Sequence, residues 1–113
     1  MVEEKVFKVV VTRPALIRYQ ETVLVYLFEH FSYERAREID ESILATATTL
    51  QRNPARGRKE KCLEELNQGF RFILHKETRH LEIKIIYYIL ERTVYITDFF
   101  PTRMDPRKIT RGK

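Results

Sequence analysis

Three strand-like segments joined by two very short connections constrain this chain more than any other feature of its sequence. Residues 70–76, 81–90 and 93–100 are rich in β-branched and aromatic residues, and apolar side chains recur there at every second position. The connections leave room only for tight turns, so each segment must pair antiparallel with the next one. The sequence therefore predicts an antiparallel meander, in which Ile83 and Lys84 point to opposite faces of the sheet.

One strand and two helices are predicted before this meander. Residues 6–12 are rich in valine and indicate a β-strand. Apolar residues at helical spacing predict a helix over residues 15–31, interrupted by Gln20 as a buried amide or a shallow point of the helix face. Ser32 is a suitable N-cap for a second helix, which we expect to end just before Pro54. Because the connection between the two helices is so short, they should form an antiparallel hairpin.

The apolar stripes of these helices identify the predicted core. The stripes contain Leu16, Val23, Leu24, Leu27, Phe28 and Phe31 in the first helix, and Ala36, Ile39, Ile43, Leu44, Ala47 and Leu50 in the second. In the last strand Phe99 and Phe100 are adjacent, so they must point to opposite faces of the sheet. Residues 54–69 are predicted to be a loop with about one turn of structure.

The order β-α-α-β-β-β places the chain in the α+β class, as a single two-layer domain spanning all 113 residues. We expect an antiparallel sheet with the helical hairpin on one face. The second face is then left partly open, and Arg71, His75 and Lys84 are predicted to line it as a groove for a partner. Ile86 and Tyr88 are expected to be exposed there, which favours self-association or a partner protein.

Positive charge is concentrated in the second half of the chain. The formal net charge is +5, but residues 1–50 carry a net −2 and residues 51–113 a net +7. The positive side chains form two clusters, one in residues 52–61 and one in a basic tail over residues 102–113. Basic surfaces attract nucleic acids and acidic protein segments through a salt-sensitive field. The alternative is a solvated surface that only keeps a small protein soluble.

Several other classes of protein are disfavoured by the sequence. The three histidines have no metal-ligand spacing and Cys62 has no nearby partner, so neither a metal site nor a cofactor is expected. His75 and His80 are predicted to be two residues at a hairpin end, with an acid–base pair across the hairpin as the alternative. A single cysteine, the lack of a signal-peptide pattern, and apolar runs far short of the roughly 20 residues that span a bilayer favour a cytoplasmic protein without a membrane partner.

Four short segments, taken in order, give the chain a resemblance to a known family. The segments are Asn53-Pro54-Ala55-Arg56-Gly57-Arg58, Gly69-Phe70-Arg71, Ile83-Lys84-Ile85-Ile86-Tyr87-Tyr88, and Ile96-Thr97-Asp98-Phe99-Phe100-Pro101-Thr102-Arg103-Met104-Asp105-Pro106. Following a strand and two helices, they resemble the RelE/ParE superfamily of toxins from type II toxin–antitoxin modules, also called plasmid stabilization proteins. The resemblance implies a concave basic sheet face and a cognate acidic antitoxin that wraps the toxin and neutralises it.

Two activities occur on this family's fold, so the resemblance leaves the target open. RelE-like members cut mRNA in the ribosome with basic residues and a tyrosine near the C-terminus, whereas ParE-like members inhibit DNA gyrase without being nucleases. Position by position, Arg71, Lys84 and Arg103 match the basic residues of the RelE-like set, with His75 as a possible acid or base. Ile73 replaces a second basic residue and the C-terminal tyrosine is absent, so we favour the ParE-like branch.

The resulting hypothesis is a cytoplasmic toxin that is neutralised by an acidic antitoxin and acts on DNA gyrase. The first alternative is a ribosome-dependent mRNA endonuclease, and the second is a non-toxic module that binds nucleic acid or an antitoxin. A homodimer or a toxin–antitoxin hetero-oligomer is expected. The residues predicted to bind the antitoxin or the target are Arg56, Arg58, Lys59, Arg71, Lys84, Phe100, Arg103 and Arg107.

Overall fold

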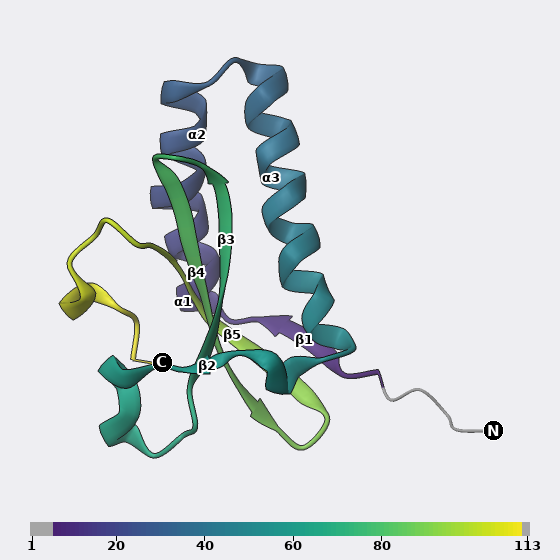
Figure 1. Cartoon of the computed structure of the whole chain (residues 1–113). Coiled ribbons are helices and arrows are strands. Elements are labelled where there is room, and N and C mark those ends of the chain that lie inside the picture. Colours follow the sequence, from purple (N-terminus) through teal and green to yellow (C-terminus); the bar gives the residue numbers. More distant parts are fainter. Residues whose placement is uncertain (1–5, 112–113) are drawn as a thin grey trace.

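Five strands form one sheet in the computed structural model, which describes residues 6–111 (Figure 1). The order across the sheet is β1-β5-β4-β3-β2, and two helical segments that form a hairpin pack on it. The predicted α+β class and the order β-α-α-β-β-β are therefore confirmed. The strands are β1 (Lys8–Val11), β2 (Arg58–Lys59), β3 (Arg71–Thr78), β4 (Leu81–Leu90) and β5 (Thr93–Pro101).

The sheet is mixed, whereas an antiparallel sheet was predicted. The meander β3-β4-β5 is antiparallel as expected, but β1 runs parallel to β5, with Val10 opposite Tyr95. The parallel pair is possible because the helical hairpin and the meander lie between the two strands in the sequence. The second strand of the sheet, β2, falls in the segment predicted as a loop, since Arg58 and Lys59 show no apolar alternation.

The first helical segment is one rod with a wider turn in its middle. It consists of α1 (Arg13–Arg18), a π-helical turn η1 (Tyr19–Val23) and α2 (Leu24–His30). The π turn keeps residues four apart on the same side, and the buried positions are Ala15, Tyr19, Val23 and Leu27. The predicted stripe was therefore partly wrong: Leu16 and Phe28 are exposed, and Gln20 lies on the solvent side.

The second helix, α3 (Tyr33–Thr48), begins where the sequence predicts. The Ser32 hydroxyl accepts a hydrogen bond from the Arg35 backbone N–H at 3.2 Å, which satisfies one of the free donors at the helix start. A 3-10 turn over Thr49–Gln51 ends the helix before Pro54. The predicted stripe of α3 is buried except for Leu44, which is exposed.

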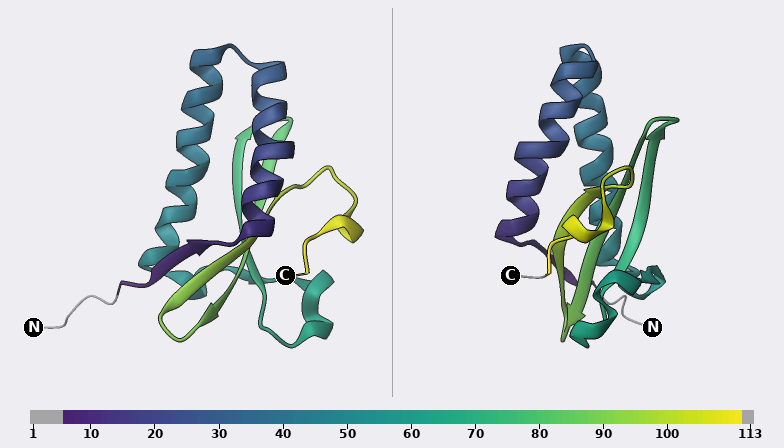
Figure 2. Two further views of the ribbon diagram at one scale, coloured as in Figure 1. Left: turned by 180° about the vertical axis from the view of Figure 1, so that it is seen from behind. Right: turned by 90° about the vertical axis from the view of Figure 1, so that its left-hand side faces the viewer.

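The main core lies between the helices and the sheet, as the side view in Figure 2 shows. Every second residue of the central strands faces the helices, including Ile73 of β3, Ile85 of β4 and Phe99 of β5. Phe100 belongs to a second apolar cluster, so the prediction that the two adjacent phenylalanines face opposite sides is confirmed.

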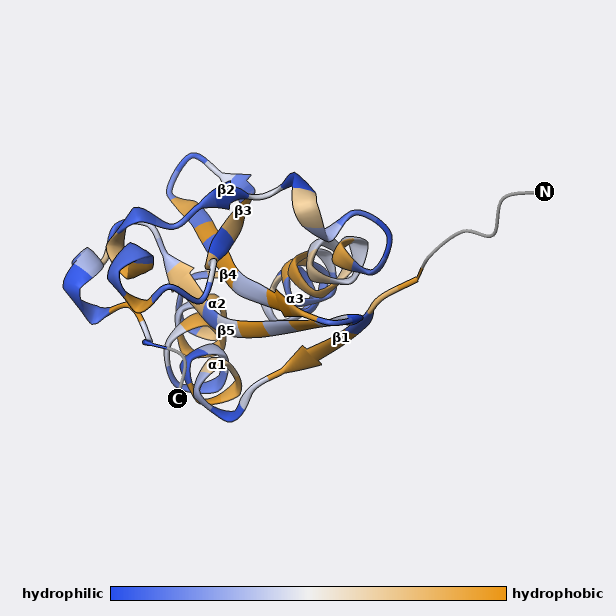
Figure 3. Ribbon diagram, turned by 90° about the horizontal axis from the view of Figure 1, so that it is seen from below, coloured by the Kyte–Doolittle hydropathy of each residue, from blue (hydrophilic) through white to orange (hydrophobic). Residues whose placement is uncertain are grey.

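The second sheet face is covered by the chain itself, which contradicts the predicted open groove. Leu63, from the 3-10 helix η4 (Lys61–Leu66), and Ile109, which follows η5 (Pro106–Lys108), pack with Phe100 and Ile86. Ile86 is fully buried as a result, although exposure was expected. Both covering segments are mostly hydrophilic in Figure 3, so each covers the strands with only a single apolar side chain.

A buried tyrosine fixes the segment that follows α3. The Tyr87 hydroxyl donates a hydrogen bond to the Pro54 carbonyl at 2.5 Å and accepts one from the Gly57 N–H at 3.1 Å. Gly57 has ordinary extended dihedrals, but a Cβ atom there would lie 2.2 Å from the Tyr87 hydroxyl oxygen and 2.9 Å from the Phe72 carbonyl oxygen. Glycine is therefore required at position 57 by close approach.

Gly57→Ala should lower the free energy of unfolding by about 1–3 kcal/mol, the usual range for overpacking a well-packed site. The penalty should shrink when Tyr87→Phe is introduced as well, because the nearest clashing atom is then gone. Urea denaturation of the wild type, both single variants and the double variant measures this coupling. An equal penalty in both backgrounds would contradict the close contact.

Candidate functional site

Arg71 and Lys84 point to opposite faces of the sheet, so the predicted groove lined by Arg71, His75 and Lys84 is wrong. Arg71 alternates with Ile73 and His75, which face the helices, and it donates hydrogen bonds to the Gly57 carbonyl at 2.8 Å and the Ala55 carbonyl at 3.4 Å. Lys84 lies on the other side.

Lys84 is already paired inside the chain. Its ammonium group lies 2.7 Å from the carboxylate of Glu60 and 4.3 Å from the centre of the Phe72 ring. Glu60 is buried and also accepts a hydrogen bond from the Cys62 N–H at 3.0 Å. This lysine therefore neutralises an internal carboxylate, and its charge is not free to hold a phosphate group.

His75 is part of a buried polar network between β3 and α3. One ring nitrogen lies 2.7 Å from the Thr46 hydroxyl and the other 2.8 Å from the carboxylate of Glu77, which Arg35 also contacts at 3.1 Å. His80 lies in the turn at the end of the hairpin and is exposed. The alternative of an acid–base pair between the two histidines is therefore wrong, and so is the predicted exposure of His75.

This network makes the stability of the fold depend on pH through Glu77. Burial would raise the pKa of Glu77, but hydrogen bonds with His75 and Ser42 and the charges of His75 and Arg35 lower that pKa below its ordinary value. A lowered pKa means that the carboxylate stabilises the fold above the ordinary pKa of glutamate, and that this stabilisation is lost as the pH falls through the lowered value.

Glu77→Gln should therefore lower the free energy of unfolding by about 1–3 kcal/mol near neutral pH, the range for a hydrogen bond to a charged group. The difference from the wild type should shrink in acid, where the wild-type carboxylate is protonated as well. Urea denaturation across an acid-to-neutral pH series measures both effects. The control is Glu41→Gln, a change of the same kind on the exposed side of α3. A pH-independent difference would contradict this assignment.

The other predicted binding residues are dispersed over the molecule. Arg56 donates a hydrogen bond to the Thr49 hydroxyl at 2.6 Å, Arg107 forms an exposed ion pair with Asp105 at 2.6 Å, and Phe100 is buried. Arg58 and Lys59 on β2 are exposed, and within residues 6–111 no acidic side chain pairs with either of them.

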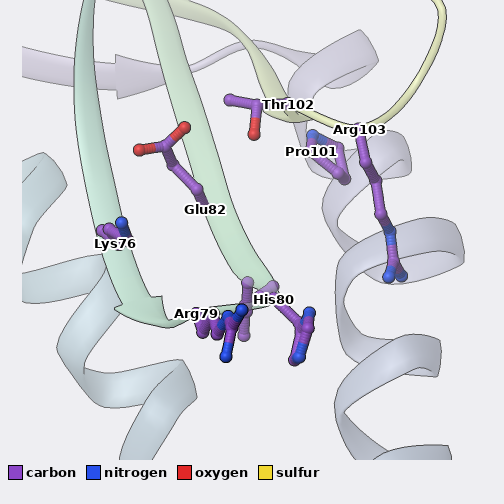
Figure 4. Close-up of a pocket in the computed structure, with 8 residues that line it drawn as sticks. Lys76, Arg79, His80, Glu82, Pro101, Thr102 and Arg103 are labelled. Carbon is purple, nitrogen blue, oxygen red and sulfur yellow. The ribbon is translucent and has the colours of Figure 1, made fainter.

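A cavity of about 310 Å³ at the β3–β4 turn brings one predicted residue, Arg103, together with positive side chains that the sequence analysis did not single out (Figure 4). We call it the hairpin-tip cavity. It lies between the end of the hairpin and the chain after β5, because β4 and β5 pair so that Ile83 lies opposite Pro101. Its lining residues are Lys76, Arg79, His80, Leu81, Glu82, Pro101, Thr102 and Arg103.

The positive charge of the hairpin-tip cavity is only partly compensated. Lys76 and Arg79 have no ion pair among the described residues, and Arg103 contacts only the ring of Tyr26, at 4.1 Å. Glu82 supplies the one carboxylate of the lining, further along β4 from the turn in Figure 4. Basic residues around a tight turn were the available signal in the sequence, but their meeting with Arg103 depends on strand register.

Other kinds of site were sought in the same part of the chain. Across residues 6–111, no group of three or more histidine, cysteine, aspartate or glutamate side chains is placed to hold a metal ion. None of the helices in this range has the length and apolar character needed to cross a membrane. No protein-family model matches the chain, and no curated protein matches it either.

Proposed function

We propose that this chain is the toxin of a type II toxin–antitoxin module, that it arrests growth in the cytoplasm, and that it does so by ParE-like inhibition of DNA gyrase. The β-α-α-β-β-β order is compatible with the family that the sequence resembles. Two of the segments that carry this resemblance have clear structural roles. Pro54 and Gly57 are the hydrogen-bond partners of Tyr87, and Asp105 accepts a hydrogen bond from the Arg107 N–H at the start of η5.

The placement of Arg71 and Lys84 carries the choice between the two activities. RNA cleavage by basic residues requires them to surround one phosphate group, so that they stabilise its charge together. Here the two side chains lie on opposite faces, and each one already contacts groups of the chain itself. This arrangement favours the non-nuclease branch over a ribosome-dependent endonuclease.

The neutralising partner in this proposal is an acidic antitoxin segment, and β2 offers it a suitable surface. Arg56 and Arg58 line a cavity of about 300 Å³ together with Phe72 and Leu74. Leu74 is 46% exposed, so an acidic segment with apolar residues would meet both positive charge and apolar surface there.

Growth and gyrase assays test this function. Induced expression of the chain should arrest growth, and the purified chain should inhibit supercoiling by purified gyrase or trap cleaved DNA, while mRNA in ribosomes stays intact. Cleavage of ribosome-bound mRNA instead would establish the endonuclease alternative. Normal growth at full expression would leave only the non-toxic binding module.

A further inference from the structure

A second cavity adjoins the hairpin-tip cavity and differs from it in chemistry. It has a volume of about 270 Å³, and Val25, Tyr26 and Met104 contribute to a mainly apolar wall. We call it the helix-side cavity. Arg103 and Leu81 line both cavities, so the two are continuous around these side chains.

The charged groups of the two cavities are also different. The hairpin-tip cavity contains the positive side chains of Lys76 and Arg79, whereas Glu21 and Glu29 line the helix-side cavity. These two carboxylates form no ion pair among the described residues. A ligand that fills both cavities therefore needs an anionic group at one end and a flat or apolar group with hydrogen-bond donors at the other.

We propose that these two cavities together bind one nucleotide of a single-stranded nucleic acid, with its phosphate in the hairpin-tip cavity and its base in the helix-side cavity. Lys76, Arg79 and Arg103 supply positive charge to the phosphate. The base lies against the apolar wall next to Tyr26, since aromatic side chains favour contact with flat base rings. A base stacked inside a duplex cannot enter such a cavity, so the strand must be single.

Glu21 and Glu29 distinguish this ligand from an acidic peptide. A peptide rich in aspartate and glutamate would be repelled by two unpaired carboxylates at the apolar end of the site. A base with an exocyclic amino group instead donates hydrogen bonds to them, as cytosine does to carboxylate side chains. The site should therefore prefer cytosine to thymine, and Glu21→Gln/Glu29→Gln should weaken that preference.

Fluorescence anisotropy with a labelled oligo-deoxycytidine and the purified full chain tests the proposal. Lys76→Ser/Arg79→Ser should weaken binding about tenfold or more, and should reduce the slope of log K against log salt by about 1.4, or about 0.7 for each lost phosphate contact. Oligo-deoxythymidine should bind about fivefold more weakly than oligo-deoxycytidine, at the low end of base discrimination.

Arg58→Ser/Lys59→Ser is the matched control, because it removes the same two charges from exposed positions on β2. This control should leave the affinity within about a factor of two of the wild type, since it removes no phosphate contact. Equal losses in the two double variants would mean that net charge alone attracts the oligonucleotide, and would overturn the proposal. A duplex that competes as well as the single strand would overturn it too.

Poly-glutamate is the third probe, and the growth assay separates this proposal from the previous one. Binding of poly-glutamate that is lost in Lys76→Ser/Arg79→Ser, with no binding of the oligonucleotide, would assign the cavities to an acidic protein segment and refute the nucleotide. A chain that arrests growth but binds no oligonucleotide likewise refutes only this inference. Oligonucleotide binding by a chain that does not arrest growth supports it and refutes the proposed toxin.

Discussion

Arg18→Met should lower the free energy of unfolding by about 3–5 kcal/mol, the range for breaking a buried ion pair by removing one partner. Asp98 on β5 is fully buried, and its carboxylate lies 3.0 Å from Nε of Arg18. Methionine retains the apolar stem of the side chain but leaves this carboxylate with the Thr110 N–H, at 2.8 Å, as its remaining hydrogen-bond donor. Urea denaturation measures the loss.

The loss should be large because the guanidinium group joins three parts of the chain. Arg18 belongs to α1 and reaches Asp98 on β5, and it also donates a hydrogen bond to the Lys108 carbonyl at 2.5 Å. The same group lies 5.4 Å from the centre of the Phe100 ring. The segment after β5 is therefore held against the sheet face by a helix on the other layer.

Two further variants separate the buried charge from other effects of the substitution. Adding Asp98→Asn to Arg18→Met should recover part of the stability, since no unpaired charge is then buried. Arg37→Met is the control, because Arg37 forms an exposed pair with Glu41 that is worth less than about 1 kcal/mol. A loss in Arg18→Met no larger than in this control would rule out a stabilising role for the buried pair.

Lys84→Met should destabilise the fold by about 3 kcal/mol, at the lower end of the range for a broken buried pair, since Lys84 remains partly exposed. The substitution leaves the buried carboxylate of Glu60 without its positive partner. Lys84→Met/Glu60→Gln should recover most of the stability, because the carboxylate is then replaced by a neutral amide of similar shape. Urea denaturation of the two single variants and the double variant measures the coupling.

This second prediction also separates a structural role of Lys84 from a catalytic one. If the lysine only neutralises Glu60, the double variant should regain both stability and growth arrest. A double variant that is stable but no longer arrests growth would show that Lys84 acts on the target, and would restore the endonuclease alternative. A loss of activity in Lys84→Met alone does not distinguish the two roles, since the folded population also falls.

Elements with local periodicity could be predicted from the sequence, while the faces of the sheet could not. The segment 81–90 and the Ser32 cap were located correctly, because alternation and capping are local signals. The error at Arg71 has a physical cause. Both faces of the central strands are covered by apolar side chains, so alternation alone does not say which face is inside. Strand register decides it, by placing Ile73 opposite Ile85.

The candidate site was less predictable because its contacts join distant parts of the sequence. The pairing of Glu60 with Lys84 and the meeting of Arg103 with the hairpin turn both depend on how the strands align. The turn itself lies at Arg79 and His80, after an irregularity between Lys76 and Thr78, whereas residues 77–79 were predicted. Nothing in the local pattern indicates such an irregularity.

The parallel pairing of β1 with β5 has a consequence for the order in which a nascent chain acquires structure. Lys8 and its partner Thr93 are separated by 85 residues, so β1 leaves the ribosome long before the strand it pairs with has been translated. Until then the helical hairpin has no complete sheet to cover, and its apolar side remains available to chaperones or to a partner already present. The fold therefore closes late in synthesis, and a truncated translation product that lacks β5 would have neither β1 in place nor a finished core.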